Sequence, residues 1–491
     1  MRFALVNDEL IPEPLAEQQS TLRPISQIPH WNTPAYNPHF SYLPELQHIL
    51  VGKQLLLEEL SFSTNQLHEH YQNGCIFYRK GIANGRCERC GNSSSFGQFP
   101  CARCKEDCRY CRVCLMMGRV SECTPLVSWS GPLPVVQTLP VMTWSGTLSP
   151  PQQDASQRVI KSMNKREELL VWAVCGAGKT EVLFPGIEAA LKQNLRVCLA
   201  SPRTDVIIEL KPRLQAAFSQ TDVIALYGGS PDRSKTAPLV LPTTHQLLRY
   251  YKSFDLIILD EVDAFPYTTE PMLHYAVKQA RKDDSALVYL TATPSLLWQK
   301  EVKRGKRNAV MIPARYHRHA IPVPIFQWCG NWRKALKKKR LVSVLVEWLQ
   351  QRIDEQKQVF LFLPQIDLME TVVACIKTFC SSVAGVHSED PERKEKVARF
   401  RKGDILILVT TTILERGVTV PNIDVAVLGA EDAIFTESAL VQIGGRVGRS
   451  ASFPTGNITF FHYGKTLEMK RAVHHIQAMN KLAKGRGLID D

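Results

Sequence analysis

Short apolar runs recur along the chain from Leu148 onward, and each ends in a polar or glycine-rich turn. The runs are "LLVWAVCGAGKT", "LRVCLASPRT", "DLIILDEVDA", "ALVYLTATP", "VFLFLPQ", "DILILVTTT" and "DVAVLGA". Their length, their content of Val, Ile and Leu, and their alternation with helical segments are typical of parallel strands buried on both faces. A basic segment, "RKALKKKRL", separates the runs into two sets. The pattern therefore predicts an α/β protein with two parallel-sheet lobes.

The remaining segments differ in pattern and predict further parts of the chain. Residues 1–74 mix prolines and aromatics with one helix-like stretch, and residues 75–124 hold a cysteine-rich module. Residues 125–147 are rich in Pro, Ser and Trp, which indicates a connector or an edge strand, because proline has no N–H for a central strand. We expect the first lobe to span 148–315 and the second to span 316–491.

A glycine-rich loop follows the first apolar run, in "AVCGAGKT". Lys179 would neutralise the β and γ phosphates of a nucleotide, and Thr180 would hold Mg²⁺. The alternative is a glycine turn with a chance lysine, but an apolar strand before the loop and a helical segment after it favour the phosphate site. The small residues whose N–H groups can surround phosphate oxygens are Gly176, Ala177 and Gly178.

Charged residues that suit hydrolysis end two other runs. In "LIILDEVD", Asp260 can hold Mg²⁺ through its water shell, and Glu261 can orient or deprotonate the attacking water. In "QIGGRVGR", Arg446 and Arg449 suit the charge that develops on a γ-phosphate. Taken alone, these residues would be a solvated acidic turn and a basic surface turn. Together with the glycine loop and its Lys179, they predict the catalytic residues of an ATP hydrolase.

The net charge indicates a class of partner, and the N-terminal sequence indicates a cellular compartment. The formal net charge of +13 favours a nucleic-acid partner through counterion release, although many proteins carry such an excess as a solvated surface. The N-terminal "MRFALVNDELIPEPLAEQQ" lacks the apolar core of a secretory signal. No run approaches the ~18 apolar residues of a membrane-spanning helix. We therefore expect a cytoplasmic protein whose thiols stay reduced.

The stretch "CERCGNSSSFGQFPCARCKEDCRYCRVC" contains seven cysteines. In a reducing compartment, C-x-x-C units favour zinc over disulfides, because one tight turn supplies two thiolates to a tetrahedral ion. The alternatives are buried small thiols and a redox pair, but nothing like a thioredoxin unit surrounds these cysteines. Cys87 and Cys90 make one knuckle of a zinc site. Two pairs are candidates for the other, Cys101 with Cys104 and Cys111 with Cys114, and the second choice fits the common zinc-ribbon spacing.

In their order, these motifs resemble those of superfamily 2 helicases and translocases, whose lobes are RecA-like. "LSPPQ" with Gln152 is similar to the adenine-contacting glutamine motif, "AVCGAGKT" and "DEVD" to motifs I and II, and "TAT" to the motif that couples hydrolysis to movement. "TTILERGVT" resembles motif V and "QIGGRVGR" motif VI. "DEVD" departs from the better-known "DEAD" but retains both carboxylates.

Several longer phrases resemble the ComFA family of late-competence ATPases. They are "YCRVCLMMGRVSEC", "WSGTLSPPQ", "WAVCGAGKTE", "DEVDAFPY", "TTHQLL" and "PARYHRHAIPVP". The resemblance implies an ATP-dependent translocase on single-stranded DNA that drives DNA uptake in transformation, with ATP, Mg²⁺ and Zn²⁺ as cofactors. It also implies a peripheral place at the inner face of the cell membrane, beside a ComEC-like channel and a ComFC-like partner, and it leaves oligomer formation open.

Two alternative functions remain open at this point. One is a duplex-unwinding DNA helicase of replication restart or repair. The other is a zinc-dependent DNA-binding scaffold whose nucleotide site only switches its conformation.

The resemblance also assigns ligand and contact residues. Its "YCRxC" phrase favours Cys87, Cys90, Cys111 and Cys114 as the zinc ligands. We hypothesise that the remaining cysteines hold a second zinc ion, and these are Cys101, Cys104, Cys108 and Cys123. By the same resemblance, nucleic acid would run along the loops "SPRT", "YGGS", "TTHQ" and "VTTT", although Thr and Gly also make turns and cap helices. The expected contact residues are Arg203, Gly229, Thr244, Gln246 and Thr411.

Overall fold

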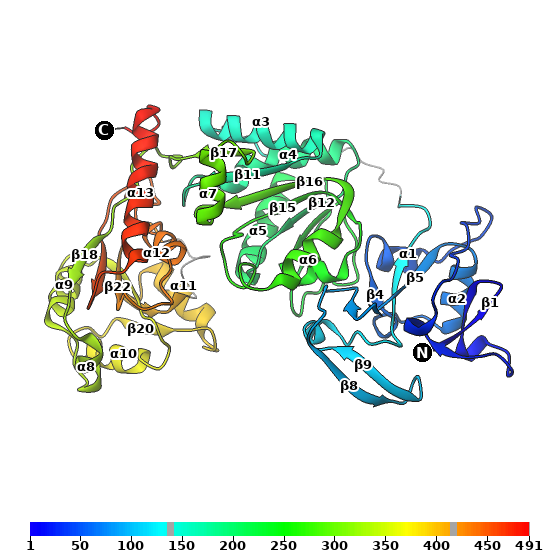
Figure 1. Ribbon diagram of the computed structural model, residues 1–491. Coiled ribbons are helices and arrows are strands. Elements are labelled where there is room, and N and C mark those ends of the chain that lie inside the picture. The colour runs from blue at the N-terminus through cyan, green and yellow to red at the C-terminus, as the bar shows by residue number, and fades with distance from the viewer. Residues whose placement is uncertain (135–141, 413–419, 491) are drawn as a thin grey trace. The chain divides into compact units, whose positions relative to one another are not determined.

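The computed structural model describes residues 1–134, 142–412 and 420–490 (Figure 1). The chain divides into two compact units, and each is built from segments that are separate in the sequence. The first unit comprises Met1–Gly146, Gln157–Leu169 and Phe184–Tyr289. The second unit comprises Thr147–Ser156, Leu170–Leu183 and Leu290–Asp491.

The N-terminal part of the first unit contains two small antiparallel sheets, with strand orders β2-β1-β3 and β4-β10-β5. Side chains of two helices and of both sheets share one hydrophobic core, which includes Phe3, Leu50, Tyr71 and Val127. The helices are α1 (Pro44–Leu50) and α2 (Thr64–Gln72). The strands are β1 (Arg2–Val6), β2 (Glu9–Pro12), β3 (Arg23–Pro24), β4 (Leu55–Leu56), β5 (Ile76–Lys80) and β10 (Pro125–Trp129).

Helix α2 shows how local chemistry sets a boundary. In the helix-like stretch of the sequence, residues 55–71, the α-helix begins at Thr64, where Ser63 accepts a hydrogen bond from the backbone N–H of Gln66 at 3.2 Å. Gln66 in turn accepts a hydrogen bond from the backbone N–H of Ser63 at 3.0 Å. This reciprocal cap satisfies donors that the first helical turn leaves without partners.

Two short hairpins carry most of the clustered cysteines. The hairpin β6–β7 ends at Cys87, and the longer hairpin β8–β9 bears Cys101, Cys108 and Cys111. Their strands are β6 (Ile82–Ala83), β7 (Arg86–Cys87), β8 (Phe96–Cys101) and β9 (Glu106–Cys111). An isolated hairpin is marginally stable in water, so these two need additional support.

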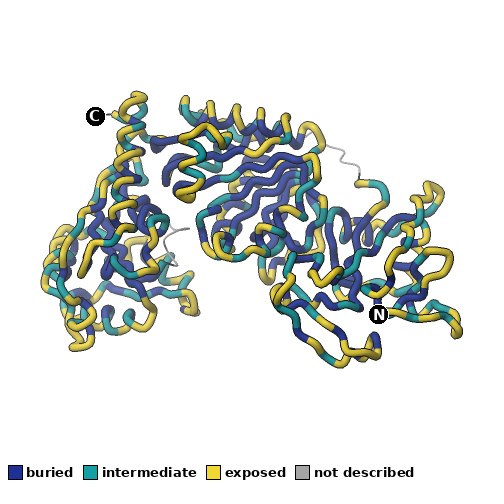
Figure 2. The backbone as a smooth tube through the Cα atoms, viewed as in Figure 1, coloured by how far each residue is buried: buried dark blue, intermediate teal, exposed yellow. Residues whose placement is uncertain are grey.

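The first lobe is a seven-stranded sheet with the order β13-β14-β12-β15-β16-β11-β17. Its strands are β11 (Glu168–Ala173), β12 (Val197–Ala200), β13 (Val223–Leu226), β14 (Leu239–Pro242), β15 (Phe254–Leu259), β16 (Arg281–Thr291) and β17 (Ala309–Ile312). Its helices are α3 (Pro150–Lys165), α4 (Lys179–Lys192), α5 (Thr204–Ala217), α6 (Pro271–Ala280) and α7 (Leu296–Lys303). Strands β12 to β15 are buried throughout, as the dark blue segments of Figure 2 show.

The second lobe is a six-stranded parallel sheet with the order β18-β23-β22-β19-β21-β20. Its strands are β18 (Ile325–Trp328), β19 (Gln358–Phe362), β20 (Val383–Val386), β21 (Ile407–Thr410), β22 (Ile423–Leu428) and β23 (Ile458–His462). Its helices are α8 (Trp332–Lys337), α9 (Ser343–Asp354), α10 (Met369–Lys377), α11 (Arg393–Lys402), α12 (Glu437–Gly444) and α13 (Leu467–Gly485). The prediction of two parallel-sheet α/β lobes is therefore confirmed.

Within the described ranges, no helix combines the length and the apolar character that a membrane crossing requires.

Candidate functional site

The glycine loop lies in the second unit, between strand β11 and helix α4. Gly176 and Gly178 have φ angles of 82° and 68°, a region that side chains other than glycine rarely adopt. A Cβ atom on Gly178 would lie 2.5 Å from Nε2 of Gln152. Glycine is therefore required at this position both by its backbone conformation and by the close approach of Gln152.

Gln152 is buried against the glycine loop and is held at both ends of its amide. Its Nε2 donates to the carbonyl oxygen of Ala177 at 2.8 Å, and its Oε1 accepts from the backbone N–H of Ser149 at 2.8 Å. The structure thus brings Gln152, Gly176, Ala177 and Gly178 together. Gln152 positions the loop directly ahead of Lys179.

Lys179 and Thr180 occupy the first turn of α4, and both are partly exposed. The N–H groups of a first helical turn lack partners within the helix, and the helix dipole places positive charge there, so phosphate groups bind well at such ends. The loop and this 14-residue helix fit the phosphates of ATP, and Thr180 offers a hydroxyl to Mg²⁺. ATP would supply the phosphate bond to be cleaved. Mg²⁺ would supply positive charge that offsets the charge of the phosphates.

Asp260 and Glu261 lie in the first unit, immediately after β15. The backbone N–H of Asp260 donates to Ala200 at 2.8 Å, and its Oδ1 accepts from the backbone N–H of Glu261 at 2.9 Å. Glu261 has a φ of 55°, an uncommon value for a residue other than glycine. Both carboxylates therefore lie at a strand end. They belong to the first unit, whereas the glycine loop belongs to the second.

The two arginines follow helix α12, in the second unit. Arg446 is buried, and Arg449 is partly exposed and donates through Nε to the carbonyl oxygen of Gly445 at 2.9 Å. On α12 itself, Gln442 accepts a hydrogen bond from the thiol of Cys175 at 3.1 Å. The second unit therefore brings the segment that carries both arginines next to the residue that precedes Gly176.

Arg315 is a residue to which the sequence analysis assigned no role. Its Nε donates to the carbonyl oxygen of Cys175 at 3.1 Å, while Nη1 and Nη2 donate to the carbonyl oxygens of Val447 at 2.7 Å and Gly445 at 3.1 Å. Burial, and then the nearby charge of Arg449, lowers the pKa of this guanidinium to about 10. Arg315 thus ties the start of the glycine loop to the arginine segment. Nothing in the phrase "PARYHRHA" shows that this arginine is buried, so no sequence signal could have found it.

The expected nucleic-acid contacts of the first unit follow three neighbouring strands. Strands β12, β14 and β13 pair in parallel, so their carboxyl ends lie at the same edge of the sheet. At that edge the backbone N–H of Thr244 donates to Ser201 at 3.0 Å, which links the loop of Arg203 to that of Thr244. The third loop, which contains Gly229, joins them because the N–H of Thr243 donates to the last residue of β13 at 2.8 Å.

These candidates differ in how far they are exposed. Gly229 is exposed with open space around it, and Arg203 and Gln246 are partly exposed. Thr244 is almost fully buried, and its backbone N–H already donates to Ser201. Thr411 is buried just after β21, and residues 413–419 of the predicted motif V lie outside the described residues.

Eight cysteines of the module form two groups, which we call the first and second tetrads. All four sulfur atoms of each tetrad lie within 4.8 Å of one another, and all eight residues are buried. A tetrahedral ion with Zn–S bonds of 2.3 Å needs sulfur atoms about 3.8 Å apart, so both tetrads have the donor set and the spacing for zinc. The first comprises Cys87, Cys90, Cys111 and Cys114, and the second comprises Cys101, Cys104, Cys108 and Cys123.

The first tetrad has additional donors around its sulfur atoms. Arg89 is 1% exposed, and its Nη2 donates to the sulfur of Cys114 at 3.2 Å and to its carbonyl oxygen at 2.8 Å. Asn92 donates through Nδ2 to the sulfur of Cys111 at 3.4 Å. Such donors orient thiolate ligands and offset their negative charge. Neither Arg89 nor Asn92 was predicted, although Arg89 lies between the two cysteines of the first C-x-x-C unit.

The thiols of the first tetrad shift one another's pKa values through their mutual hydrogen bonds. Hydrogen bonds from Cys114, and then from Cys87 and Cys90, lower the pKa of the Cys111 thiol. A hydrogen bond to Cys111 raises the pKa of Cys90 in turn. Zinc, once bound, would hold all four as thiolates.

The module packs against the first-lobe strands and helices of the same unit. Tyr275 of α6 donates through its hydroxyl to the carbonyl oxygen of Glu88 at 3.3 Å, and a Cβ on Gly91 would lie 2.5 Å from its ring. On the 3-10 helix η5 (Thr244–Arg249), Gln246 approaches the sulfur of Met117 at 3.9 Å. The first tetrad therefore adjoins a segment that holds two of the expected nucleic-acid contacts.

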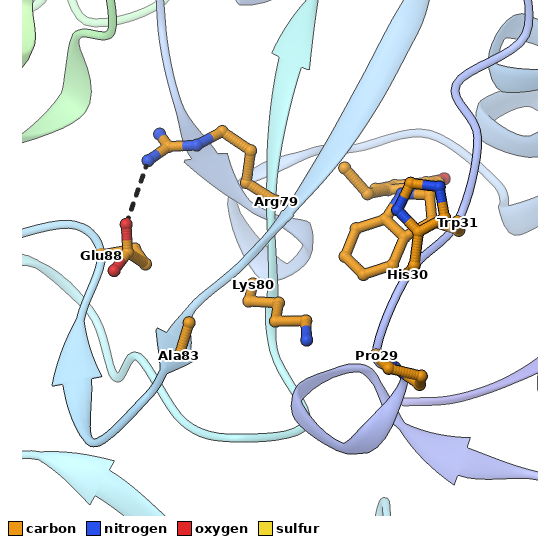
Figure 3. Close-up of a pocket in the computed structure, with 8 residues that line it drawn as sticks. Pro29, His30, Trp31, Arg79, Lys80, Ala83 and Glu88 are labelled. Carbon is orange, nitrogen blue, oxygen red and sulfur yellow. Dashed lines mark ion pairs between the residues drawn. The ribbon is translucent and has the colours of Figure 1, made fainter.

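An open pocket of about 330 Å³ lies in the N-terminal part of the first unit (Figure 3). Trp31 and Lys80 line it, with the Lys80 ammonium 5.7 Å from the centre of the Trp31 ring. Arg79 also lines it, but its guanidinium is engaged by Glu88, another lining residue, at 3.6 Å and by the ring of Tyr251 at 3.8 Å. Arg79 therefore serves packing more than ligand binding, and we assign no ligand to this pocket.

Comparisons with family models cover most of these features. The ComFA N-terminal domain model matches residues 39–128, the type III restriction enzyme res subunit model matches residues 145–296, and the helicase conserved C-terminal domain model matches residues 337–451. Among solved structures, Saccharomyces cerevisiae Dbp5 bound to RNA and ADP BeF3 has a TM-score of 0.50 and 17% identity, and the match covers 68% of this chain and 92% of that one. Fold and site together define a two-lobe α/β protein whose lobes resemble those of RecA-like helicases.

Two curated relatives identify the family more narrowly. The competence protein ComFA of Bacillus subtilis is 49% identical over 448 residues, which cover 90% of this chain and 96% of that protein. The competence protein ComFA of Streptococcus pneumoniae is 40% identical over 376 residues, which cover 76% and 86%. The chain belongs to the ComFA family of competence proteins.

Proposed function

We propose that this protein is an ATP-dependent translocase that moves along single-stranded DNA and drives the import of transforming DNA during competence. The observation that carries the proposal is the arrangement of the second unit in a ComFA-family chain. There, Gln152 holds the glycine loop, and Arg315 connects the start of that loop to the arginine segment. A hydrolase that converts ATP turnover into movement needs such a link between its phosphate site and the part that moves.

Each charged residue of the site has a role in the proposed hydrolysis. Lys179 would neutralise the β and γ phosphates, and Thr180 and Asp260 are the residues that would hold Mg²⁺. Glu261 orients and deprotonates the attacking water, and the proton passes to its carboxylate. Arg446 and Arg449 stabilise the charge that develops on the γ-phosphate, as an arginine finger supplied within the same chain.

The nucleic-acid track rests on the sheet edge of the first unit. Loops that present backbone amides and hydroxyls can hold phosphates without reading the bases, which suits a protein that must accept any sequence. The Dbp5 structure contains a nucleic-acid strand together with a nucleotide analogue, which supports the pairing of the two ligands on this fold. The net charge of +13 adds a favourable, salt-dependent term to DNA binding.

The cellular setting of the proposal follows from family membership. We place the protein on the cytoplasmic side of the membrane, peripheral to a ComEC-like channel, with a ComFC-like protein as partner. Zinc in the first tetrad would fix the module against the segment of Thr244 and Gln246. The module would then guide DNA or a partner toward the track rather than take part in hydrolysis.

The test is the rate of ATP hydrolysis with single-stranded DNA, duplex DNA and RNA, each at the same stated salt concentration. We expect single-stranded DNA to stimulate turnover most, and Lys179→Ala to abolish that stimulation while DNA binding persists. Strand displacement from a blunt duplex would instead support a helicase of restart or repair. Negligible turnover at saturating single-stranded DNA would overturn the proposal in favour of a nucleotide-switched scaffold.

A further inference from the structure

The second tetrad lies at the turn end of the β8–β9 hairpin. Cys101 ends β8, Cys104 lies in the turn, Cys108 lies on β9, and Cys123 comes from the segment that precedes β10. None of the four is more than 5% exposed, and the sulfur atoms of Cys101 and Cys123 are 3.7 Å apart. That distance is close to the value of about 3.8 Å for two sulfur ligands on a tetrahedral zinc ion.

The turn between Cys101 and Cys104 repeats the turn of the first tetrad. In the first tetrad, the N–H of Gly91 donates to the carbonyl oxygen of Cys87 at 2.8 Å, and Gly91 has a φ of 76°. In the second, the N–H of Lys105 donates to the carbonyl oxygen of Cys101 at 2.8 Å, and Lys105 has a φ of 59°. A lysine rarely adopts this conformation, so the surrounding structure must hold it there.

Ordinary apolar packing does not account for this part of the hairpin. Among the described residues, the hydrophobic cluster around the turn consists of the four cysteines, and the partly buried Phe99 packs against it. Four thiols and one ring bury little apolar surface, and a two-stranded hairpin is marginal in water on that basis. The other tetrad does not supply the missing support, because it takes its β9 ligand, Cys111, from the opposite end of that strand.

The same end of the hairpin contacts the N-terminal segment of the chain. The backbone N–H of Ser26 donates to the carbonyl oxygen of Glu122 at 3.1 Å, next to Cys123. Gln27 donates through Nε2 to the carboxylate of Glu106 at 3.0 Å, at the start of β9. These contacts depend on the place of the hairpin turn, which the four sulfur atoms define.

We propose that Cys101, Cys104, Cys108 and Cys123 bind a second zinc ion, independently of the first tetrad, and that this ion fastens the β8–β9 hairpin to the N-terminal segment. Zinc binding at this site requires four thiols, which become thiolates and release their protons to solvent when the ion binds. The proposal does not depend on DNA translocation.

The test is native mass spectrometry of the full-length chain purified with a reductant, which counts bound zinc ions directly. We expect two ions in the unaltered chain, corresponding to the two tetrads. Cys104→Ser should lower the count to one, Cys90→Ser should do the same, and the double variant should hold none. Cys375→Ser is the matched control, because this less buried cysteine belongs to neither tetrad, and it should keep both ions.

Hydrogen–deuterium exchange separates the two tetrads without reference to activity. In Cys104→Ser, we expect faster exchange in residues 96–111 and around Ser26 and Gln27, while residues 87–92 stay protected. A count of one ion in the unaltered chain overturns the proposal, and that measurement does not require any variant to fold. Thiols of this set that react with an alkylating agent only after reduction would show disulfides in place of zinc and would equally overturn it.

Discussion

The lobes and the cysteine-rich module of this chain are stabilised in different ways. The second lobe has a large apolar core, in which residues such as Leu345, Leu361 and Ile407 are fully buried. The module around the hairpin turn has cysteines where such a core would be. A sheet that is buried on both faces can bear a loop of demanding geometry at its edge, whereas a hairpin without a core depends on a bound ion. We therefore expect changes in the lobes to affect turnover and changes in the module to affect metal content and order.

The largest expected effect is on ATP turnover, from Lys179→Ala. Loss of a preorganised charge at the phosphates should lower the rate by about 10²-fold or more. Zinc content and thermal stability should not change, because the side chain is partly exposed and lies outside both tetrads. Steady-state ATPase measurements check the rate. Lys192→Ala, at the other end of the same helix and paired with Glu188 at 2.7 Å, is the matched control. A comparable loss in that variant would contradict the assignment.

Cys90→Ser, which takes one thiol from the first tetrad, should have the next largest effect, and that effect should be confined to the module. Binding of a structural metal is coupled to folding, so the module should lose several kcal/mol of stability. Hydrogen–deuterium exchange should show faster exchange in residues 87–92 and 111–114, while residues 101–108 of the second tetrad stay protected. ATP hydrolysis without DNA should persist in the lobes. Unfolding of the lobes together with the module would contradict the expectation that the two are stabilised in different ways.

Arg315→Ala tests the connection inside the second unit. It removes donors to the carbonyl oxygens of Cys175, Val447 and Gly445. Gly445 still accepts from Arg449, so two buried acceptors, Cys175 and Val447, lose this partner, which should cost about 4 kcal/mol. We expect a lower denaturation midpoint together with a lower ATPase rate. Arg318→Ala is the control, since Arg318 is exposed and pairs with Asp490 at 2.8 Å. Unchanged turnover in Arg315→Ala would remove this residue from the coupling that we propose.

The smallest expected effect is a pH dependence from Lys53, where the N-terminal part of the first unit contacts the first lobe. Its ammonium donates to the carbonyl oxygen of Lys235 at 3.0 Å, and burial, then the charges of Arg196 and Arg249, lowers its pKa from 10.5 to about 8. The folded chain therefore releases this proton before the unfolded chain does. As pH rises from 8 to 10.5, the free energy of unfolding should increase by up to about 3 kcal/mol from this group.

The Lys53→Met variant isolates the contribution of Lys53 to the pH dependence of the unfolding free energy. The difference in unfolding free energy between the unaltered chain and the variant should move in favour of the unaltered chain as pH rises, because methionine does not titrate. Lys192→Met, at an exposed lysine, should show no such trend. A difference that stays constant with pH would show that Lys53 is not held in a low-dielectric environment.

Residues whose role is local were accessible from the sequence. The glycine loop could be recognised because an apolar strand, small residues and a lysine follow one another within a few positions, and each meets its neighbours through the backbone. The two-lobe α/β fold was predicted for a similar reason, since buried strands need uninterrupted apolar runs. Strand β10 shows the limit of this reasoning. Residues 125–129 were expected to be a connector or an edge strand, yet they pair with β4 and β5 on both sides. Pro125 is tolerated because it is the first residue of that strand.

The sequence by itself determined the class of the fold, and it predicted the glycine loop and the cysteines as metal ligands, because all three rest on spacing along the chain. Only the tertiary structure decided that Arg315 donates hydrogen bonds to both Cys175 and Gly445. The same is true of the hydrogen bond from Arg89 to the sulfur of Cys114, and of the turn at Lys105 that repeats the turn at Gly91. These contacts join residues far apart in the chain or depend on burial. A charged side chain in a sequence looks the same whether it will be solvated or enclosed, and only packing in three dimensions distinguishes the two.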